Sequence, residues 1–228
     1  KTPDGLAGTL SDIGFFSLNY HKHIHSGEGG VIVTNDDHLA AKSKLRRNHG
    51  YNQPPTSTLD NLHQVRTEQS LLSLGHGCRL SEVHAAVGCI QMKRMKCILE
   101  KRNAIAEWYT ENLCDLTDVT CPTIEPNVQM SWDGYVIRLS DRFSQEERDG
   151  VIRGLHRHDI GAADFYQSIT TLQPFIKFHN QDNLCPVSES ISKRTIALPF
   201  YTTMKQKEVE IVCQTLELML TREMFKHS

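Results

Sequence analysis

The chain has 228 residues, of which 39% are hydrophobic and 23% are charged, a composition typical of an ordinary globular protein with one or two domains. Its formal net charge of −2 and isoelectric point near 6.7 argue against a global attraction to nucleic acid or to an anionic membrane. No apolar run approaches the roughly 20 residues of a membrane-spanning helix, and no signal peptide opens the sequence, so a cytoplasmic protein is expected.

The seven cysteines are an odd number, are widely scattered and include no Cys-X-X-Cys pair. This pattern argues against a disulfide framework and against a structural zinc site. We expect most of them to be small buried apolar residues in a reducing compartment. The sequence begins with a lysine rather than a methionine, which suggests either processing or a place within a longer chain.

Two short apolar runs near the beginning predict strands at residues 13–17 and 31–34. The loop between them ends in Gly27-Glu28-Gly29-Gly30, which is too rich in glycine for a helix. Lys22 lies in this loop among polar and small residues. A lysine with a free amine is a nucleophile, and tight glycine turns let a backbone approach a ligand closely.

A helix capped by Asp36 or Asp37 follows and is expected to stop at residues 48–50. Residues 51–70 are polar, contain two consecutive prolines and predict a long irregular loop. Loops of this length within compact domains are often functional. From Ser81 onward, apolar residues recur at helical spacing and predict two successive helices that bridge to a second region.

The second region alternates strands and helices. Residues 134–139 and 195–198 read as strands. Ser144-Gln145-Glu146-Glu147 and Thr203-Met204-Lys205-Gln206 read as capping boxes, each opening a helix. The run Glu146-Glu147-Arg148-Asp149 is expected to be a solvated helix face. These elements predict a small α+β domain of ordinary size.

The segment around Lys22 resembles the cofactor-lysine segment of the DegT/StrS family of nucleotide-sugar aminotransferases. Its landmarks are Ser17-Leu18-Asn19-Tyr20-His21-Lys22, Ser26-Gly27-Glu28-Gly29-Gly30 and Val33-Thr34-Asn35-Asp36. Later landmarks follow in the family's order. They are Arg47-Asn48-His49-Gly50, which is similar to its RNHG turn; residues 74–88, similar to its GYNYRM run and the helix after it; and residues 186–189 and 196–199, similar to its C-terminal domain.

The resemblance implies an α/β fold of the type I pyridoxal 5′-phosphate (PLP) aminotransferase architecture. Residues 1–115 would form the end of the PLP-binding large domain with the bridging helices, and residues 116–228 the small C-terminal α+β domain. The implied reaction moves an amino group, usually from glutamate, to a keto-sugar attached to a nucleotide. A homodimer with shared active sites is implied. From charge, hydropathy and ligand spacing, no nucleic acid, membrane or metal is expected to take part.

The resemblance also implies roles for single residues. Lys22 would form the internal aldimine with PLP and then shuttle a proton, while Ser17 would donate its hydroxyl to the cofactor phosphate. Arg79 would reach the phosphate in the neighbouring subunit, although it could also be a surface residue at a helix N-terminus. His21, Glu28 and His49 are the candidate substrate-binding residues.

Plainer readings compete with these three. Glu28 could simply be fixed by its turn, and His49 could end the preceding helix and favour its dipole. His21 alternates with His23 and His25, so an extended segment would place all three on one side. A transition metal is one use for such a set, although no carboxylate or cysteine lies at ligand spacing and loop polarity is the favoured interpretation.

Several positions depart from the family pattern. Gly77 stands where the family places asparagine, Asp133-Gly134 replaces an aromatic or polar pair, and residues 161–164 lack the substrate-facing histidine or arginine. The family's acidic residue that holds the pyridine nitrogen protonated lies too far before the lysine to be within this chain. Asp12 matches a different, structural position in the family's Gly-Asp turn.

Three readings of function follow. The first is an active aminotransferase, of which this chain is a part. The second is a non-catalytic remnant or partner subunit that keeps the fold. The third is a PLP-dependent sugar dehydratase, which is disfavoured because those enzymes carry histidine in place of the lysine and Lys22 is present.

Overall fold

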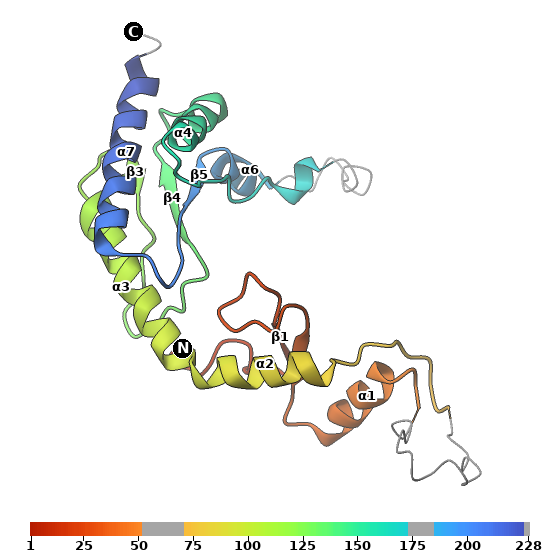
Figure 1. The fold of residues 1–228 in the computed structure, drawn as a ribbon. Helices are drawn as coiled ribbons and strands as arrows, with labels where there is room; N and C mark the ends of the chain where they lie inside the picture. The colour runs from red at the N-terminus through yellow and green to blue at the C-terminus, as the bar shows by residue number, and fades with distance from the viewer. Residues whose placement is uncertain (52–70, 173–184, 226–228) are drawn as a thin grey trace. The chain divides into compact units, whose positions relative to one another are not determined.

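A computed structural model describes residues 1–51, 71–172 and 185–225. The chain divides into two compact units, which are described separately (Figure 1). Unit 1 consists of Lys1–Met95 and Asn127–Gln129, and unit 2 of Lys96–Pro126 and Met130–Ser228. The amino group of Lys1 donates to the carbonyl of Gln129 at 2.7 Å, and this hydrogen bond joins the segment Asn127–Gln129 to the N-terminus within unit 1.

Unit 1 contains an antiparallel strand pair and two helices. β1 (Gly14–Ser17) pairs with β2 (Gly30–Val33), with Phe15 opposite Ile32. α1 (Asp37–Arg47) begins after Asp36, whose carboxylate accepts from two backbone amides of the first turn. α2 (Glu82–Lys93) begins after Ser81, whose hydroxyl accepts from the amide of His84. The two predicted strands and both predicted helix starts are confirmed.

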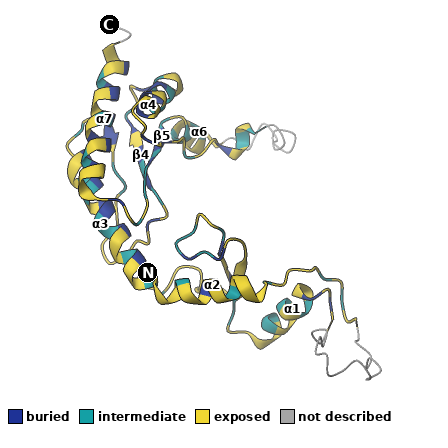
Figure 2. Ribbon diagram, in the orientation of Figure 1, coloured by how far each residue is buried: buried dark blue, intermediate teal, exposed yellow. Residues whose placement is uncertain are grey.

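Unit 1 buries little apolar surface. Within the described residues, Leu18 and Ile24 are its only buried hydrophobic side chains, and sixteen large hydrophobic side chains in this unit are exposed. α1 buries no residue, and α2 buries only Gly88. In Figure 2 helices α1 and α2 are correspondingly coloured mostly as exposed.

Unit 2 is built on a three-stranded antiparallel sheet with the order β3-β4-β5. The strands are β3 (Val119–Thr120), β4 (Tyr135–Leu139) and β5 (Thr195–Leu198). The helices are α3 (Met95–Leu113), α4 (Gln145–Arg157), α6 (Pro186–Ser192) and α7 (Gln206–Met224), with a short 3-10 turn, η2 (Ile169–Thr171). Both predicted strands are confirmed, whereas β3 and α6 were not predicted.

The core of unit 2 is apolar and continuous. Tyr109 of α3 and Tyr135 of β4 are fully buried and stack at 4.8 Å between ring centroids. The Tyr109 hydroxyl donates to the carbonyl of Pro199 at 2.7 Å, so its polar end is satisfied. The buried face of α7 includes Val209, Val212, Leu216 and Leu220. Burial on this scale is what stabilises a domain of this size.

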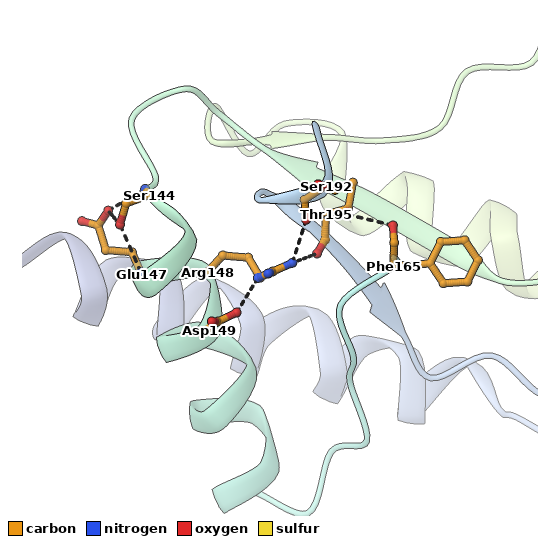
Figure 3. A network of polar contacts seen from close by, with 7 residues as sticks. All are labelled: Ser144, Glu147, Arg148, Asp149, Phe165, Ser192 and Thr195. Carbon is orange, nitrogen blue, oxygen red and sulfur yellow. Dashed lines mark hydrogen bonds and ion pairs between the residues drawn. The ribbon is translucent and has the colours of Figure 1, made fainter. Parts of the chain in front are cut away.

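The prediction that residues 146–149 form a solvated helix face is wrong for Arg148. This side chain is only 3% exposed. Its Nε donates to Asp149, and its Nη1 donates to the carbonyls of Ser192 and Thr195 at 3.1 and 2.9 Å (Figure 3). The guanidinium is buried because these oxygens pair with its donors, which hydropathy alone does not reveal.

Two smaller predictions are also wrong. α7 begins after Lys205 rather than after Thr203, because the Glu208 carboxylate accepts from the Lys205 amide at 2.7 Å and closes the first turn there. Most cysteines are not buried: five of the seven are exposed, Cys121 is half-buried and only Cys213 is buried.

Among the described residues, none of the helices combines the length and the hydropathy of a membrane span.

Candidate functional site in the lysine loop

The lysine loop, residues 18–29, joins β1 to β2 and carries Lys22. The strand ladder continues into it, because the Leu18 amide donates to the Gly29 carbonyl at 2.9 Å. The Ser26 amide then donates to the Leu18 carbonyl at 3.0 Å, which closes the base of the loop. Beyond this base, the Lys22 amide donates to the Asn19 carbonyl at 2.9 Å, so the lysine lies within a tight turn.

Asn19 lies at the centre of the hydrogen bonds in this loop. Its side-chain amide donates to both carboxylate oxygens of Glu28, at 3.0 and 3.1 Å. Its side-chain oxygen accepts from the His21 amide at 3.2 Å, and its own amide donates to the Ser17 hydroxyl at 3.3 Å. Asn19 therefore connects Ser17, His21, Lys22 and Glu28, which are four of the predicted site residues.

The lysine loop rests on residues that follow Arg79 in sequence. Leu18 and Ser26 are buried, and a Cβ placed on Gly88 of α2 would lie 3.8 Å from the Ser26 Cβ. Gly29 has a φ of +141°, and a Cβ there would come within 2.7 Å of a Leu80 methyl group. The backbone conformation thus favours glycine at position 29, and a side chain there would also force the Leu80 methyl group to move.

His49 and Arg79 lie in a second cluster of unit 1, where α1 ends. The amides of His76 and Cys78 donate to the carbonyls of Arg46 and Arg47 at 2.7 and 3.0 Å, and so satisfy the last turn of the helix. Arg79 donates from Nη1 to the Asn48 side-chain oxygen at 2.7 Å. Leu80 connects the two clusters, since it follows Arg79 and touches the backbone at Gly29.

Gly77 is explained by the position of His49. A Cβ on residue 77 would lie 2.9 Å from both Cε1 and Nε2 of the His49 ring. His49 itself has a φ of 56°, an uncommon conformation for a residue with a side chain. The absence of the family's asparagine at position 77 therefore accompanies a histidine ring that occupies the space above it.

The remaining candidates lie within the lysine loop. Lys22 is half-buried and His21 is exposed, with its ring packed on Tyr20 at 3.8 Å between centroids. Glu28 is exposed and engaged with Asn19, which favours the reading that its turn fixes it. Across the described residues, no three histidine, cysteine or acidic side chains are arranged to hold a metal ion.

The profile of the DegT/DnrJ/EryC1/StrS aminotransferase family matches residues 3–217. The chain belongs to this family. The match includes both units and all the landmarks named in the sequence, so the predicted resemblance is confirmed.

Individual relatives agree with the family assignment. The chain is 27% identical over 214 residues to a UDP-N-acetyl-3-dehydro-α-D-glucosamine 3-aminotransferase from Acidithiobacillus ferrooxidans, covering 93% of this chain and 52% of that protein. It is 26% identical over 215 residues to GDP-perosamine synthase from Caulobacter vibrioides, covering 94% of this chain and 54% of that protein. The chain thus spans about half the length of these relatives.

Solved structures show the same fold. PseC, a Helicobacter pylori aminotransferase involved in pseudaminic acid biosynthesis, superimposes with a TM-score of 0.84 at 24% identity, covering 97% of this chain and 57% of that one. An E. coli GDP-4-keto-6-deoxy-D-mannose-3-dehydratase with bound hydrated PLP gives 0.79 at 19% identity, covering 95% and 57%. The fold is therefore the α/β type I aminotransferase fold that the sequence predicted.

Sequence reasoning missed Asn19 and Leu80. Asn19 lies inside the family motif, but its spacing carries no signal of its own, and only the folded turn brings it to Glu28. Leu80 lies immediately before the helix cap Ser81, and no local pattern marks it as a neighbour of the lysine loop. The glycine at position 29 was the available signal for a close approach, without indicating which residue approaches.

Proposed function

We propose that this chain is part of a PLP-dependent aminotransferase that transfers an amino group from glutamate to a nucleotide-linked keto-sugar, with Lys22 as the cofactor lysine. The observation that carries the proposal is the turn in which Lys22 lies, fixed by Asn19 beside the Ser17 hydroxyl. This turn occurs at the family's lysine position, in a chain whose match to the family extends over residues 3–217.

The chemistry of these side chains fits PLP. A primary amine at Lys22 suits the aldehyde of the cofactor. The Ser17 oxygen accepts from the Asn19 amide, and among the described residues no acceptor takes its own proton, so that proton is available to a phosphate. Gly27 and Gly29 of the lysine loop have φ values of +88° and +141°, backbone conformations that favour glycine and let the loop turn tightly. When bound, PLP supplies an electron sink for the substrate carbon.

The roles proposed for this chain's residues are few. Lys22 provides the attachment point and afterwards a free amine that holds and moves a proton. Ser17 orients the phosphate by donating a hydrogen bond. His21 and His49 are proposed to face the substrate. Arg79 is proposed to serve the phosphate site of a second subunit in a homodimer.

The two units correspond to two proposed domains. Unit 1 is proposed to be the end of the PLP-binding large domain, and unit 2 the small C-terminal domain. α3 belongs to unit 2 apart from its first residue. The domain boundary at 115/116 inferred from sequence groups this helix with the large domain.

A dehydratase remains the second candidate because one of the solved structures with this fold carries that activity. The presence of Lys22 favours aminotransfer, since the family's dehydratases are expected to hold histidine at this position. The non-catalytic alternative predicts the same fold with no selective reaction at Lys22.

A labelling experiment tests the role of Lys22. The protein is incubated with PLP or with pyridoxal, which lacks the phosphate, then treated with borohydride, and the labelled lysines are identified by peptide mass spectrometry. We expect Lys22 to be labelled preferentially by PLP, and Ser17→Ala to remove this preference. Lys42, an exposed lysine of α1, is the control and should show no preference.

Equal labelling of Lys22 and Lys42 in the unsubstituted protein would remove Lys22 from its proposed role and favour the non-catalytic reading. A preference that survives Ser17→Ala would remove Ser17 alone. The substrate class is tested separately, by incubating the protein with ¹⁵N-glutamate and a panel of nucleotide keto-sugars. Transfer of ¹⁵N to a sugar supports aminotransfer, whereas loss of a hydroxyl without ¹⁵N supports the dehydratase.

A further inference from the structure

Asn19 uses both of its backbone polar groups and both ends of its side chain within the lysine loop. Its backbone binds the Ser17 hydroxyl and the Lys22 amide, and its side chain binds the His21 amide and the Glu28 carboxylate. We infer that Asn19 is a positioning residue, locked by Glu28, that sets the Lys22 amine relative to the Ser17 hydroxyl. This inference deepens the proposed function and rests on it.

The geometry explains why the hydrogen bond between Asn19 and Glu28 is needed. Ser17 ends β1, and its position is set by the strand ladder, whereas Lys22 lies five residues further on in a turn. A turn of this kind has no ladder of its own to restrain it. The side chain of Asn19 supplies that restraint by reaching across the lysine loop to Glu28, next to the start of β2. Both ends of the restraint are therefore tied to the same strand pair.

The donor and the acceptor of the Asn19–Glu28 hydrogen bond can be exchanged without changing the size of either side chain. Asn19→Asp replaces the donating amide with an oxygen of the same size, which would then face the Glu28 carboxylate and be repelled by it. Glu28→Gln replaces an acceptor oxygen with an amide. In the double variant, the amide introduced at position 28 can donate to the carboxylate introduced at position 19. The double variant should therefore restore a hydrogen bond between positions 19 and 28.

Hydrogen exchange of the Lys22 amide measures the turn directly, since this amide donates to the Asn19 carbonyl. In the whole chain without cofactor, we expect Asn19→Asp to increase its exchange rate by about tenfold through local opening. The double variant should return the rate to near that of the unsubstituted protein. The Leu72 amide, bonded to Gly50 elsewhere in unit 1, should be unaffected. Asn35→Asp, an exposed asparagine beyond β2, is the matched control.

The second readout is the preference of Lys22 for PLP over pyridoxal. Asn19→Asp should reduce it severalfold and the double variant should restore it, because the amine and the hydroxyl act together only when the turn is fixed. An unchanged exchange rate in Asn19→Asp, or a double variant as fast as the single one, would overturn the inference. A restored exchange rate without any PLP preference would instead support the conclusion that the Asn19–Glu28 hydrogen bond fixes the turn, and it would count against the proposed function.

Discussion

Arg148 shows how a single buried cation organises unit 2. It lies on α4, yet its donors reach carbonyls at the end of α6 and the start of β5. Thr195 continues the connection, since its hydroxyl donates to the Phe165 carbonyl at 2.8 Å (Figure 3). A helix, a strand and an irregular segment are thereby held together around one side chain.

Replacing this residue should be costly. Arg148→Met keeps the apolar stem but removes the arginine donor from the buried Thr195 carbonyl and the part-buried Ser192 carbonyl, so we expect a loss of about 2–4 kcal/mol in the free energy of unfolding. Arg153→Met, an exposed arginine on the same helix, is the control and should change stability by less than about 0.5 kcal/mol. Urea unfolding followed by circular dichroism measures both, and equal losses would contradict the interpretation.

Alkaline pH should destabilise unit 2 because it contains a buried cysteine thiol and two buried tyrosine hydroxyls. Burial is the main cause that raises the pKa of Cys213 from 9.0 to about 12, and burial likewise raises the pKa values of Tyr109 and Tyr135. Above about pH 9 the unfolded chain loses protons that the folded chain keeps, so stability falls as pH rises. Stability from the thiol is complete below about pH 9 and lost by about pH 12.

Cys213→Ala tests this effect. The variant should show a shallower fall in the free energy of unfolding between about pH 9 and 10 than the unsubstituted protein does, because one of the shifted groups is gone. Cys185→Ala, which removes an exposed thiol, should leave the pH dependence unchanged. Denaturant titrations at several pH values give the comparison, and an identical slope in both variants would show that Cys213 contributes nothing.

At the scale of elements, the end of α1 depends on a distant segment. The Leu72 amide donates to the Gly50 carbonyl at 2.9 Å, and Gly50 has a φ of +82°. A Cβ at this position would lie 1.7 Å from the Ser73 carbonyl oxygen. Gly50→Ala therefore cannot be accommodated unless the two segments separate.

We expect Gly50→Ala to cost more than about 1 kcal/mol locally, since both the backbone conformation and the contact oppose it. Hydrogen exchange at the Leu72 amide should accelerate, while the Lys22 amide keeps its rate. Gly161→Ala, where an added Cβ would meet no atom within 4 Å, serves as the control. Slow exchange at Leu72 in the Gly50 variant would mean that the pairing survives and that the contact is relieved elsewhere.

Local sequence signals predicted those elements whose cause is local. Asp36, Ser81 and Ser144 each cap a helix that begins immediately afterwards, because a short polar side chain satisfies the first amides wherever the helix lies. β3 has only two residues and owes its existence to pairing with β4, so it was not predictable. Arg148 and Asn19 were missed for the same reason: their partners lie across the fold or across a turn.

At the scale of the whole chain, the two units differ in how much apolar surface they bury. All buried hydrophobic side chains among the described residues except Leu18 and Ile24 lie in unit 2. Residues 96–228 should therefore fold alone with a cooperative urea transition, whereas residues 1–95 alone should not. Circular dichroism and hydrogen exchange on the two fragments test this expectation. A cooperative transition in fragment 1–95 would contradict it.

The strand pair of unit 1 has a practical consequence for the isolated chain. Phe15 and Ile32 project from one side and Phe16 and Val31 from the other, all at least 41% exposed, and neither β1 nor β2 contains a charged residue. Such strands recruit further strands along their edges. Self-association of the purified chain should increase steeply with its concentration. Added salt should change it little, because the two strands carry no charges whose interaction salt could screen.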